Sequence, residues 1–391
     1  MPKTTAKVSN RPRWLGTKEG FAKHHLVGAN TVMLTLLRDN AAALDVNAAN
    51  LDLGINRARD MLQSAATVEI VSASVANGQL EARVRVENHS GHKAPTSYPS
   101  RRMWLHFKVT DSNGNVVFES GSIDNGFITG ADDDVDQTGY EPHYNLITSA
   151  KQVQIYEAIM GDSGGDITYT LLRGAQYLKD NRLTPKGFDK SNAPDDVAVH
   201  GLAATDDPDF NLGSDEVTYS VPVAASGDLN VSVSLNYQTI SHGFLQDLYS
   251  ASHLEQVRTF QAMYDAQELK HELVASAQTT VVSDGGGTPP VVPEYTAPVI
   301  EPPALVAPTV NLTASPSSVA RGGSITLSWS STDADSCTAS DNWSGSKATS
   351  GSQAITLNSP ATFTLSCSGD GGSASGSVSY QARGRRWLEL R

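Results

Sequence analysis

The sequence is poor in cysteine, in basic residues and in long apolar runs. Its 391 residues include only two cysteines, Cys337 and Cys367, so it holds no CxxCH sequence and cannot attach a c-type haem by itself. Its 29 basic residues stand against 42 acidic ones, and the formal charge of −13 argues against nucleic acid or an anionic membrane as a partner. No apolar run approaches the ~20 residues of a membrane span.

The length is enough for two or three domains, and composition divides the chain into five segments. Residues 1–66 begin with a basic, extended arm (1–20) and continue with two apolar stretches of helical spacing, 21–37 and 50–65, which are expected to pack as a pair. Residues 67–278 are rich in strand-like runs. Residues 279–308 hold seven prolines and no basic residue, which predicts an extended linker. A small domain (309–382) and a tail with four arginines (383–391) follow.

The central segment is expected to fold as an antiparallel β-sandwich with helical insertions. Apolar and polar residues alternate over 67–75, 80–86, 104–110, 115–120, 217–223 and 229–237, and Asn77-Gly78 and Asn113-Gly114 mark turns. A short strand at 152–156 and a helix at 170–178 are predicted between them. The apolar stripe of residues 250–278 predicts a long helix. The fold class is therefore mainly β, after a short helical segment at the start.

One loop, residues 88–104, concentrates side chains that bind ligands. It lies between two predicted strands, and two prolines and a glycine constrain its path. Histidines and arginines come close together there, as in loops that contact a ligand or cofactor. A plain strand connection with solvated charges is the alternative.

Several strings of residues resemble one known family. The strings GHKAPTSYPSRRMWL (91–105), VVFESG (116–121), YEPHY (140–144), QVQIYEAIM (152–160) and YLKDNRLTPKGFDK (177–190) resemble, in the same order, the C-terminal portion of bacterial multihaem c-type cytochromes. The resemblance covers roughly residues 20–270. In that family the haems are bound at CxxCH motifs upstream of this portion. Because such a motif often continues as Met-Pro, and this chain opens Met1-Pro2, we expect a fragment that begins after the last haem site.

The resemblance implies roles for six residues. His25, within an HxxGxN pattern, would be a distal axial ligand to a haem c that is bound covalently by a region outside this chain, and His92 is the second such candidate. His24, beside His25 on the predicted first helix, and His143 would lie near a haem. Arg101 and Arg102 would pair with haem propionates or, equally, with nearby acidic residues. For the histidines, a surface or structural role remains the alternative, and for His143 we favour a bond to a neighbouring carboxylate or carbonyl.

Two other patterns suggest chemistry without the resemblance. Asp132, Asp134 and Asp136 lie near other oxygen-bearing side chains and are a calcium candidate, with a solvated acidic turn as the alternative. Residues 161–165 spell GDSGG, as around the nucleophile of some serine proteases. The rest of a protease signature is missing, and a glycine-rich turn explains the string better.

Residues 309–382 resemble the small bacterial immunoglobulin-like domains that occur as appendages of secreted proteins. The strings SITLSWS (324–330) and ATFTLSCS (361–368) carry this resemblance. In such a domain Cys337 and Cys367 are expected to form a disulfide, with two buried thiols as the alternative. A disulfide implies an oxidising compartment, either the periplasm or the exterior of a bacterium, where this domain could meet a cell-surface partner.

The sequence thus predicts the non-haem C-terminal part of an exported multihaem cytochrome, active in electron transfer rather than catalysis. Its partners would be the haem-bearing region or other redox proteins. The alternative is an extracellular adhesion or carbohydrate-binding protein of β-sandwich modules without haem. Histidines without partners near the N-terminal arm would favour the cytochrome, and exposed aromatic residues in a groove would favour the alternative.

Overall fold

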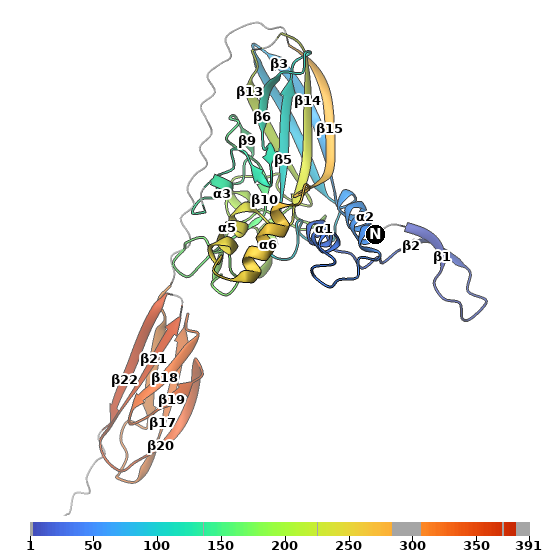
Figure 1. Ribbon diagram of the computed structural model, residues 1–391. Coiled ribbons are helices and arrows are strands. Elements are labelled where there is room, and N and C mark those ends of the chain that lie inside the picture. The colour runs from blue at the N-terminus through green and yellow to red at the C-terminus, as the bar shows by residue number, and fades with distance from the viewer. Residues whose placement is uncertain (1–2, 136, 225, 284–305, 370, 381–391) are drawn as a thin grey trace, which may run out of the picture. The chain divides into compact units, whose positions relative to one another are not determined.

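The computed structural model describes residues 3–135, 137–224, 226–283, 306–369 and 371–380. The chain forms two compact units, residues 1–300 and 301–391, which are taken one at a time below (Figure 1). Among the described residues, no helix combines the length and apolar character that crossing a membrane requires.

The first unit begins with a hairpin and two helices. Strands β1 (Lys3–Lys7) and β2 (Thr17–Ala22) pair antiparallel, so the expected extended arm is a two-stranded hairpin. Helix α1 (Thr31–Asp39) starts later than predicted, because the side chain of Asn30 accepts the N–H of Met33 and caps it. Helix α2 (Leu51–Gln63) is close to its predicted bounds.

Two sheets form the sandwich of the first unit. One has the order β3-β4-β13-β9, with bounds Ala66–Ala76, Gln79–Asn88, Ser214–Pro222 and Leu146–Ile147. The other has the order β10-β5-β14-β15, with bounds Ile155–Tyr156, Arg102–Thr110, Gly227–Gln238 and Glu272–Ser283; β6 (Val116–Ser120) also pairs with β5. Asn77 and Gly78 both have positive φ at the β3–β4 turn, as the Asn-Gly signal predicts.

Alternating residues of the two sheets meet in one core. Its central side chains are almost completely buried, and they come from β4, β5, β13 and β14. Phe107 of β5 stacks on Tyr219 of β13 with ring centroids 3.9 Å apart, which joins the two sheets. The period-2 pattern of the sequence therefore places its apolar residues where the sandwich needs them.

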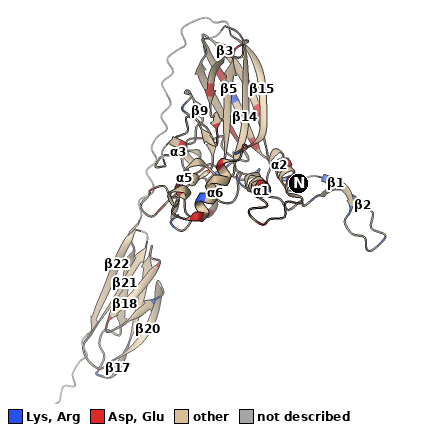
Figure 2. Ribbon diagram, in the orientation of Figure 1, with Lys and Arg blue, Asp and Glu red and all other residues tan. Residues whose placement is uncertain are grey.

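Short elements lie between and beyond the long strands. They are β7 (Ile123–Asp124), β8 (Phe127–Ile128), α3 (Asp132–Val135), β11 (Ala158–Gly161), β12 (Gln176–Asp180), α4 (Leu202–Thr205), α5 (His242–Ser250) and α6 (Glu255–Asp265). In Figure 1, helices α1, α2, α5 and α6 gather at one end of the long strands. The acidic residues of this unit are spread over strands, loops and helices (Figure 2).

Two helix predictions were wrong. Residues 170–178 form a turn followed by β12, because Gln176–Asp180 pairs with β11. The predicted helix at 250–278 divides into the end of α5, α6 and the first half of β15. Since β15 reaches Ser283, residues 279–283 of the expected linker belong to a strand, whereas residues 284–305 lie outside the described residues, as does the basic tail.

The second unit is a smaller sandwich of two antiparallel sheets. One has the order β16-β17-β20 (Thr309–Ser315, Gly323–Thr332 and Ser350–Leu357). The other has the order β19-β18-β21-β22 (Gly345–Lys347, Ser336–Asp341, Ala361–Gly369 and Gly372–Tyr380). Cys337 and Cys367 form the expected disulfide between directly paired positions of β18 and β21. The mainly β fold class is confirmed in both units.

Candidate functional site

Hydrogen bonds of Asn88 and Lys93 hold the loop between β4 and β5 in place. The amide nitrogen of Asn88 donates to the carbonyl oxygens of His92 (2.8 Å) and Leu183 (2.9 Å). Lys93 Nζ donates to the carboxylate of Asp180 at 2.6 Å. Because Asn88 and Asp180 are buried, these bonds hold the loop in one position on the sandwich.

His92 is exposed on this loop, with one ring nitrogen engaged and the other open. Nδ1 lies 2.9 Å from the carbonyl oxygen of Lys93, and because a carbonyl only accepts, Nδ1 carries the proton. The other ring nitrogen, Nε2, has no hydrogen-bond partner among the described residues. Histidines that ligate metals are commonly held in this way, with the second nitrogen donating to a carbonyl.

His24 and His25 lie on an irregular segment, not on a helix as predicted. This segment joins β2 to α1, and it leaves His24 exposed and His25 half-buried. Neither ring makes a hydrogen bond or ion pair with another described residue. The next side chain, Leu26, is 96% exposed, and its backbone has a positive φ of 54°. The segment after the hairpin therefore exposes His24 and Leu26 and leaves His25 partly accessible.

Arg102 is not available to a haem propionate, so that half of its prediction was wrong. Its side chain is completely buried, and its two terminal nitrogens each donate to Asp134 at 2.7 Å. The alternative, a pair with a nearby acidic residue, is what forms. Arg101 is partly exposed and donates to the carbonyl of Thr96 at 3.1 Å.

The same ion pair bears on the calcium prediction. Both carboxylate oxygens of Asp134 face Arg102, and one also accepts the N–H of Ile128 at 2.6 Å, so this carboxylate points away from any shared cation site. Asp132 is exposed at the start of α3, and Asp136 lies outside the described residues. Calcium binding here stays a prediction that lacks one of its three ligands.

The GDSGG string is a turn closed by the Asp162 side chain, with Ser163 exposed.

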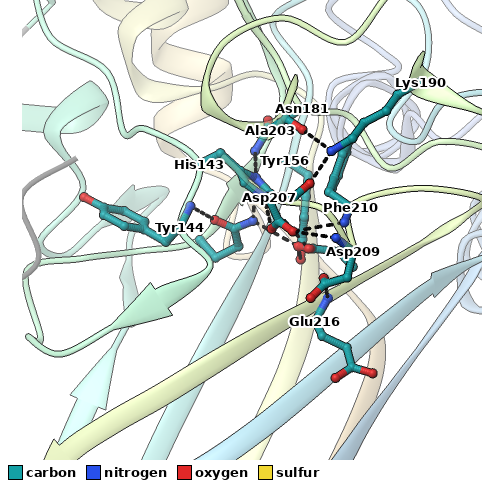
Figure 3. Close-up of polar contacts among 12 residues, drawn as sticks. His143, Tyr144, Tyr156, Asn181, Lys190, Ala203, Asp207, Asp209, Phe210 and Glu216 are labelled. Atoms are coloured by element: carbon teal, nitrogen blue, oxygen red, sulfur yellow. Dashed lines mark hydrogen bonds and ion pairs between the residues drawn. The ribbon is translucent and has the colours of Figure 1, made fainter. Parts of the chain in front are cut away.

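His143 is buried in a network that joins four segments of the first unit (Figure 3). Its Nδ1 lies 2.9 Å from the amide nitrogens of both Gln154 and Asn181. The amide orientations are fixed, because the oxygen of Gln154 accepts the N–H of Tyr144 and the oxygen of Asn181 accepts the N–H of Glu157. Nδ1 is therefore an acceptor, and the proton of the neutral ring is on Nε2.

Nε2 of His143 donates this proton to Asp207 at 2.9 Å. Burial lowers the pKa of His143 and outweighs the attraction of Asp207, so the ring is neutral. Burial alone would raise the pKa of Asp207. The hydrogen bonds from His143 and from the N–H groups of Phe210 and Asp209 have the larger opposite effect, so the pKa of Asp207 lies below its ordinary value. Asp207 is thus the anion of the network. The bond from His143 to this carboxylate is the kind of contact that the sequence analysis favoured for His143.

Asp215, on β13, is the third member. One of its oxygens accepts the hydroxyl of Tyr156 at 2.6 Å and the amide of Gln154 at 3.1 Å. Its other oxygen, Oδ1, is buried without a hydrogen-bond partner and lies 3.9 Å from Nε2 of His143. Burial, and after it the charge of Asp207, raises the pKa of Asp215 well above its usual range.

By spacing alone, this group could hold a metal ion. One ligand atom from each of His143, Asp207 and Asp215 lies within 4.8 Å of the other two. A metal at Nε2 of His143 would require the proton to move to Nδ1, where ligating histidines normally donate it. Here Nδ1 faces two amide donors, so a proton there would meet two opposing N–H groups. The donor set does not fit a metal ion.

Sequence reasoning singled out His143 and missed the rest of this network. Asp207 and Asp215 stand in acidic stretches without a recognisable motif, and only the fold brings them to His143. The alternation of β13 gave one signal: Asp215 occupies a position of the inward-facing register and is charged.

Comparison with known proteins gives only distant likenesses. No protein-family model matches the chain, and no curated protein matches it. Among solved structures, it is similar to a penta-haem cytochrome c552 from Thermochromatium tepidum, with 14% identity, a TM-score of 0.34, and coverage of 57% of this chain and 41% of that one. It is also similar to the BSP domain of a biofilm-associated protein, with 9% identity, a TM-score of 0.19, and coverage of 83% and 55%. Dimeric latent PorU from Porphyromonas gingivalis gives 11% identity, a TM-score of 0.14, and coverage of 82% and 34%.

The chain therefore spans less than half of the length of that cytochrome. At these TM-scores the likenesses say nothing about the function of individual residues. Any function must therefore be argued from the residues of this chain.

Proposed function

We propose that this chain is the β-rich, non-haem part of an exported multihaem c-type cytochrome that transfers electrons. The haems would be bound covalently by a haem-bearing region outside this chain or by another redox protein. His92 and His25 would supply distal axial ligands, with His24 beside them. The sandwich would cover the haems, exclude water and so tune their reduction potentials.

The observation that carries this proposal is the state of His92. Its Nδ1–H is held by the carbonyl of Lys93, so in the neutral ring the free lone pair is on Nε2, which has no partner among the described residues. Neutral imidazole is a good axial ligand for haem iron, and two histidines on one iron leave no open position for oxygen chemistry. His24 and His25 also lack partners among the described residues, which supports the proposal.

The second unit bears on location. The disulfide between Cys337 and Cys367 suggests an oxidising compartment outside the cytoplasm. We propose the periplasm or the cell surface of a bacterium, and a cell-surface partner for the immunoglobulin-like unit.

The adhesion or carbohydrate-binding alternative predicts aromatic side chains in a groove. Two open hollows of the first unit offer none: one lies over β5, β14 and β15 beside His106, and the other lies along α6 beside Asn40. The residues that line them are polar or aliphatic. These two hollows therefore give the alternative no support.

A spectroscopic titration tests the ligand role with the chain as it is. A short ferric haem-c peptide that carries its own proximal histidine has one open axial position. Added to this chain, it should change from a high-spin to a low-spin bis-histidine spectrum, because Nε2 of His92 or His25 fills that position. We expect His92→Ala and His25→Ala each to remove part of this change, and the double variant to remove most of it.

His253→Ala is the matched control, because His253 is also exposed and has no partner among the described residues. It should leave the titration unchanged. Equal losses in the His253, His92 and His25 variants would mean that any surface histidine binds the peptide, and the proposed ligand role would then be wrong.

A further inference from the structure

The network around His143 holds one more carboxyl group than its hydrogen bonds can stabilise as an anion. Asp207 is well served, because it accepts from the His143 ring and from two backbone N–H groups. Asp215 has two donors on one oxygen and none on the other, and it is 0% exposed. An anion buried with an unsatisfied oxygen is costly, and a neutral carboxylic acid in the same place costs much less.

The charged groups that face Asp215 do not relieve this cost. Asp207 and Asp209 add negative charge nearby, and the Tyr156 and Tyr219 hydroxyls beside it are neutral. The nearest histidine, His143, is neutral by the argument from its hydrogen bonds.

Two lysines lie in the surroundings, but neither pairs with Asp215. Lys190 directs its ammonium group to the carbonyl oxygens of Ala203 and Asp207. Lys179 is paired with Glu157 at 2.8 Å. Among the described residues, therefore, no cation forms an ion pair with Asp215.

We propose that Asp215 is a carboxylic acid at neutral pH, and that the His143–Asp207–Asp215 group is a proton-dependent lock on the loops at this end of the sandwich. The proton on Asp215 keeps a single negative charge, that of Asp207, in the group. Its loss would place two carboxylates within 4.8 Å of each other. The segments that carry them, the loop after α4 and the start of β13, would then be driven apart.

This lock would act on the loop that carries His92. Residue Gly213, two positions before Asp215, accepts the N–H of Asn88 at 2.9 Å through its carbonyl oxygen. The side chain of Asn88 in turn holds the backbone of His92. Loosening of β13 at high pH would therefore release this loop, and this step does not depend on whether His92 binds a haem.

The variant Asp215→Asn tests the proposal, since an amide has the shape of the carboxylic acid and cannot ionise. Because the folded state binds this proton more tightly than the unfolded chain, the wild type loses stability as pH rises above the ordinary aspartate range, whereas the variant does not. We expect the melting temperatures of the two proteins to be similar near pH 4. The variant should melt at a higher temperature at pH 8, with a gap that widens steadily between these values.

Two further variants and one addition keep the result interpretable. Asp180→Asn is a control in which stability should change with pH in the opposite direction. Burial alone would raise the pKa of Asp180, but Arg182 and Lys93 have a larger effect and bring it below its ordinary value. This variant should therefore be less stable than wild type at pH 8 and approach the stability of wild type in acid. Asp207→Asn should shrink the pH-dependent part of the Asp215→Asn effect, because it removes the neighbouring anion. Nitrogen NMR of the histidine rings should show His143 as the Nε2–H form.

A pH-independent gap between wild type and Asp215→Asn would overturn the proposal. So would a wild-type melting temperature that falls on addition of EDTA and rises with Zn²⁺, because this would show that the group holds a metal ion rather than a proton. A protonated Nδ1 on His143 in the NMR spectrum would contradict the hydrogen-bond assignment on which the proposal rests.

Discussion

The ion pair of Arg102 with Asp134 shows how burial decides what a charged residue can do. Both side chains are completely buried, and three donors of Arg102 are bonded, to Asp134 and to Gln238. The sequence offered a propionate or a neighbouring acid as the partner of Arg102 and could not choose. The choice depends on α3, which brings Asp134 within reach of β5 from 32 residues away.

Removal of one partner from this pair should be far worse than removal of both. We expect Arg102→Met to lower the free energy of unfolding by about 3–5 kcal/mol, because it leaves the charge of Asp134 buried and unpaired. The double variant Arg102→Met with Asp134→Leu should recover most of that loss. Urea unfolding curves of the three proteins measure both values. A single variant as stable as wild type would show that the pair is open to water.

The sequence could predict only part of the two candidate sites, which are the loop of His92 and the group of His143, Asp207 and Asp215. The alternation of the flanking strands, a local signal, placed His92 in a loop, and the resemblance to a known family made it a ligand candidate. The open state of its Nε2 depends on one backbone carbonyl and has no sequence signature. Asp207 and Asp215 come together with His143 across more than 60 residues of chain, so only the folded structure reveals them.

Among the elements, the strands were predicted well and two helices were not. The strands have a two-residue period and turn residues at their ends, and both signals are local. The stripe through Val257, Phe260 and Tyr264 is truly helical, but no glycine or proline marks its end. From Glu272 onward the burial alternates along β15, which pairs with β14, so tertiary pairing overrides the apparent helical period.

The paired strands β18 and β21 carry a prediction of their own. Their disulfide closes a loop of 30 residues, and the chain-entropy account gives about 3–4 kcal/mol of stabilisation for such a loop. Replacement of Cys337 and Cys367 by alanine should lower the stability of the second unit by this amount and leave the first unit unchanged. Separate unfolding transitions, followed by calorimetry, would show this. No loss on reduction of the wild type would contradict it.

At the scale of the whole molecule, a sandwich that carries exposed histidines is followed in the sequence by a smaller sandwich with a disulfide. The chain itself has no haem-attachment motif, so the proposed electron transfer would require haems supplied by another region or protein. The open histidines of the first unit are the feature that this account explains and that a simple adhesion module does not require.

The most direct test of this central claim is made on the native protein purified from its source cells. We would measure its mass together with its reduced-minus-oxidised visible spectrum. The account predicts c-type haem bands that copurify with this chain, either in a polypeptide longer than 391 residues or in a stable complex. A colourless protein that begins at Met1 and binds no haem-bearing partner would contradict it, and the histidines would then be ordinary surface residues.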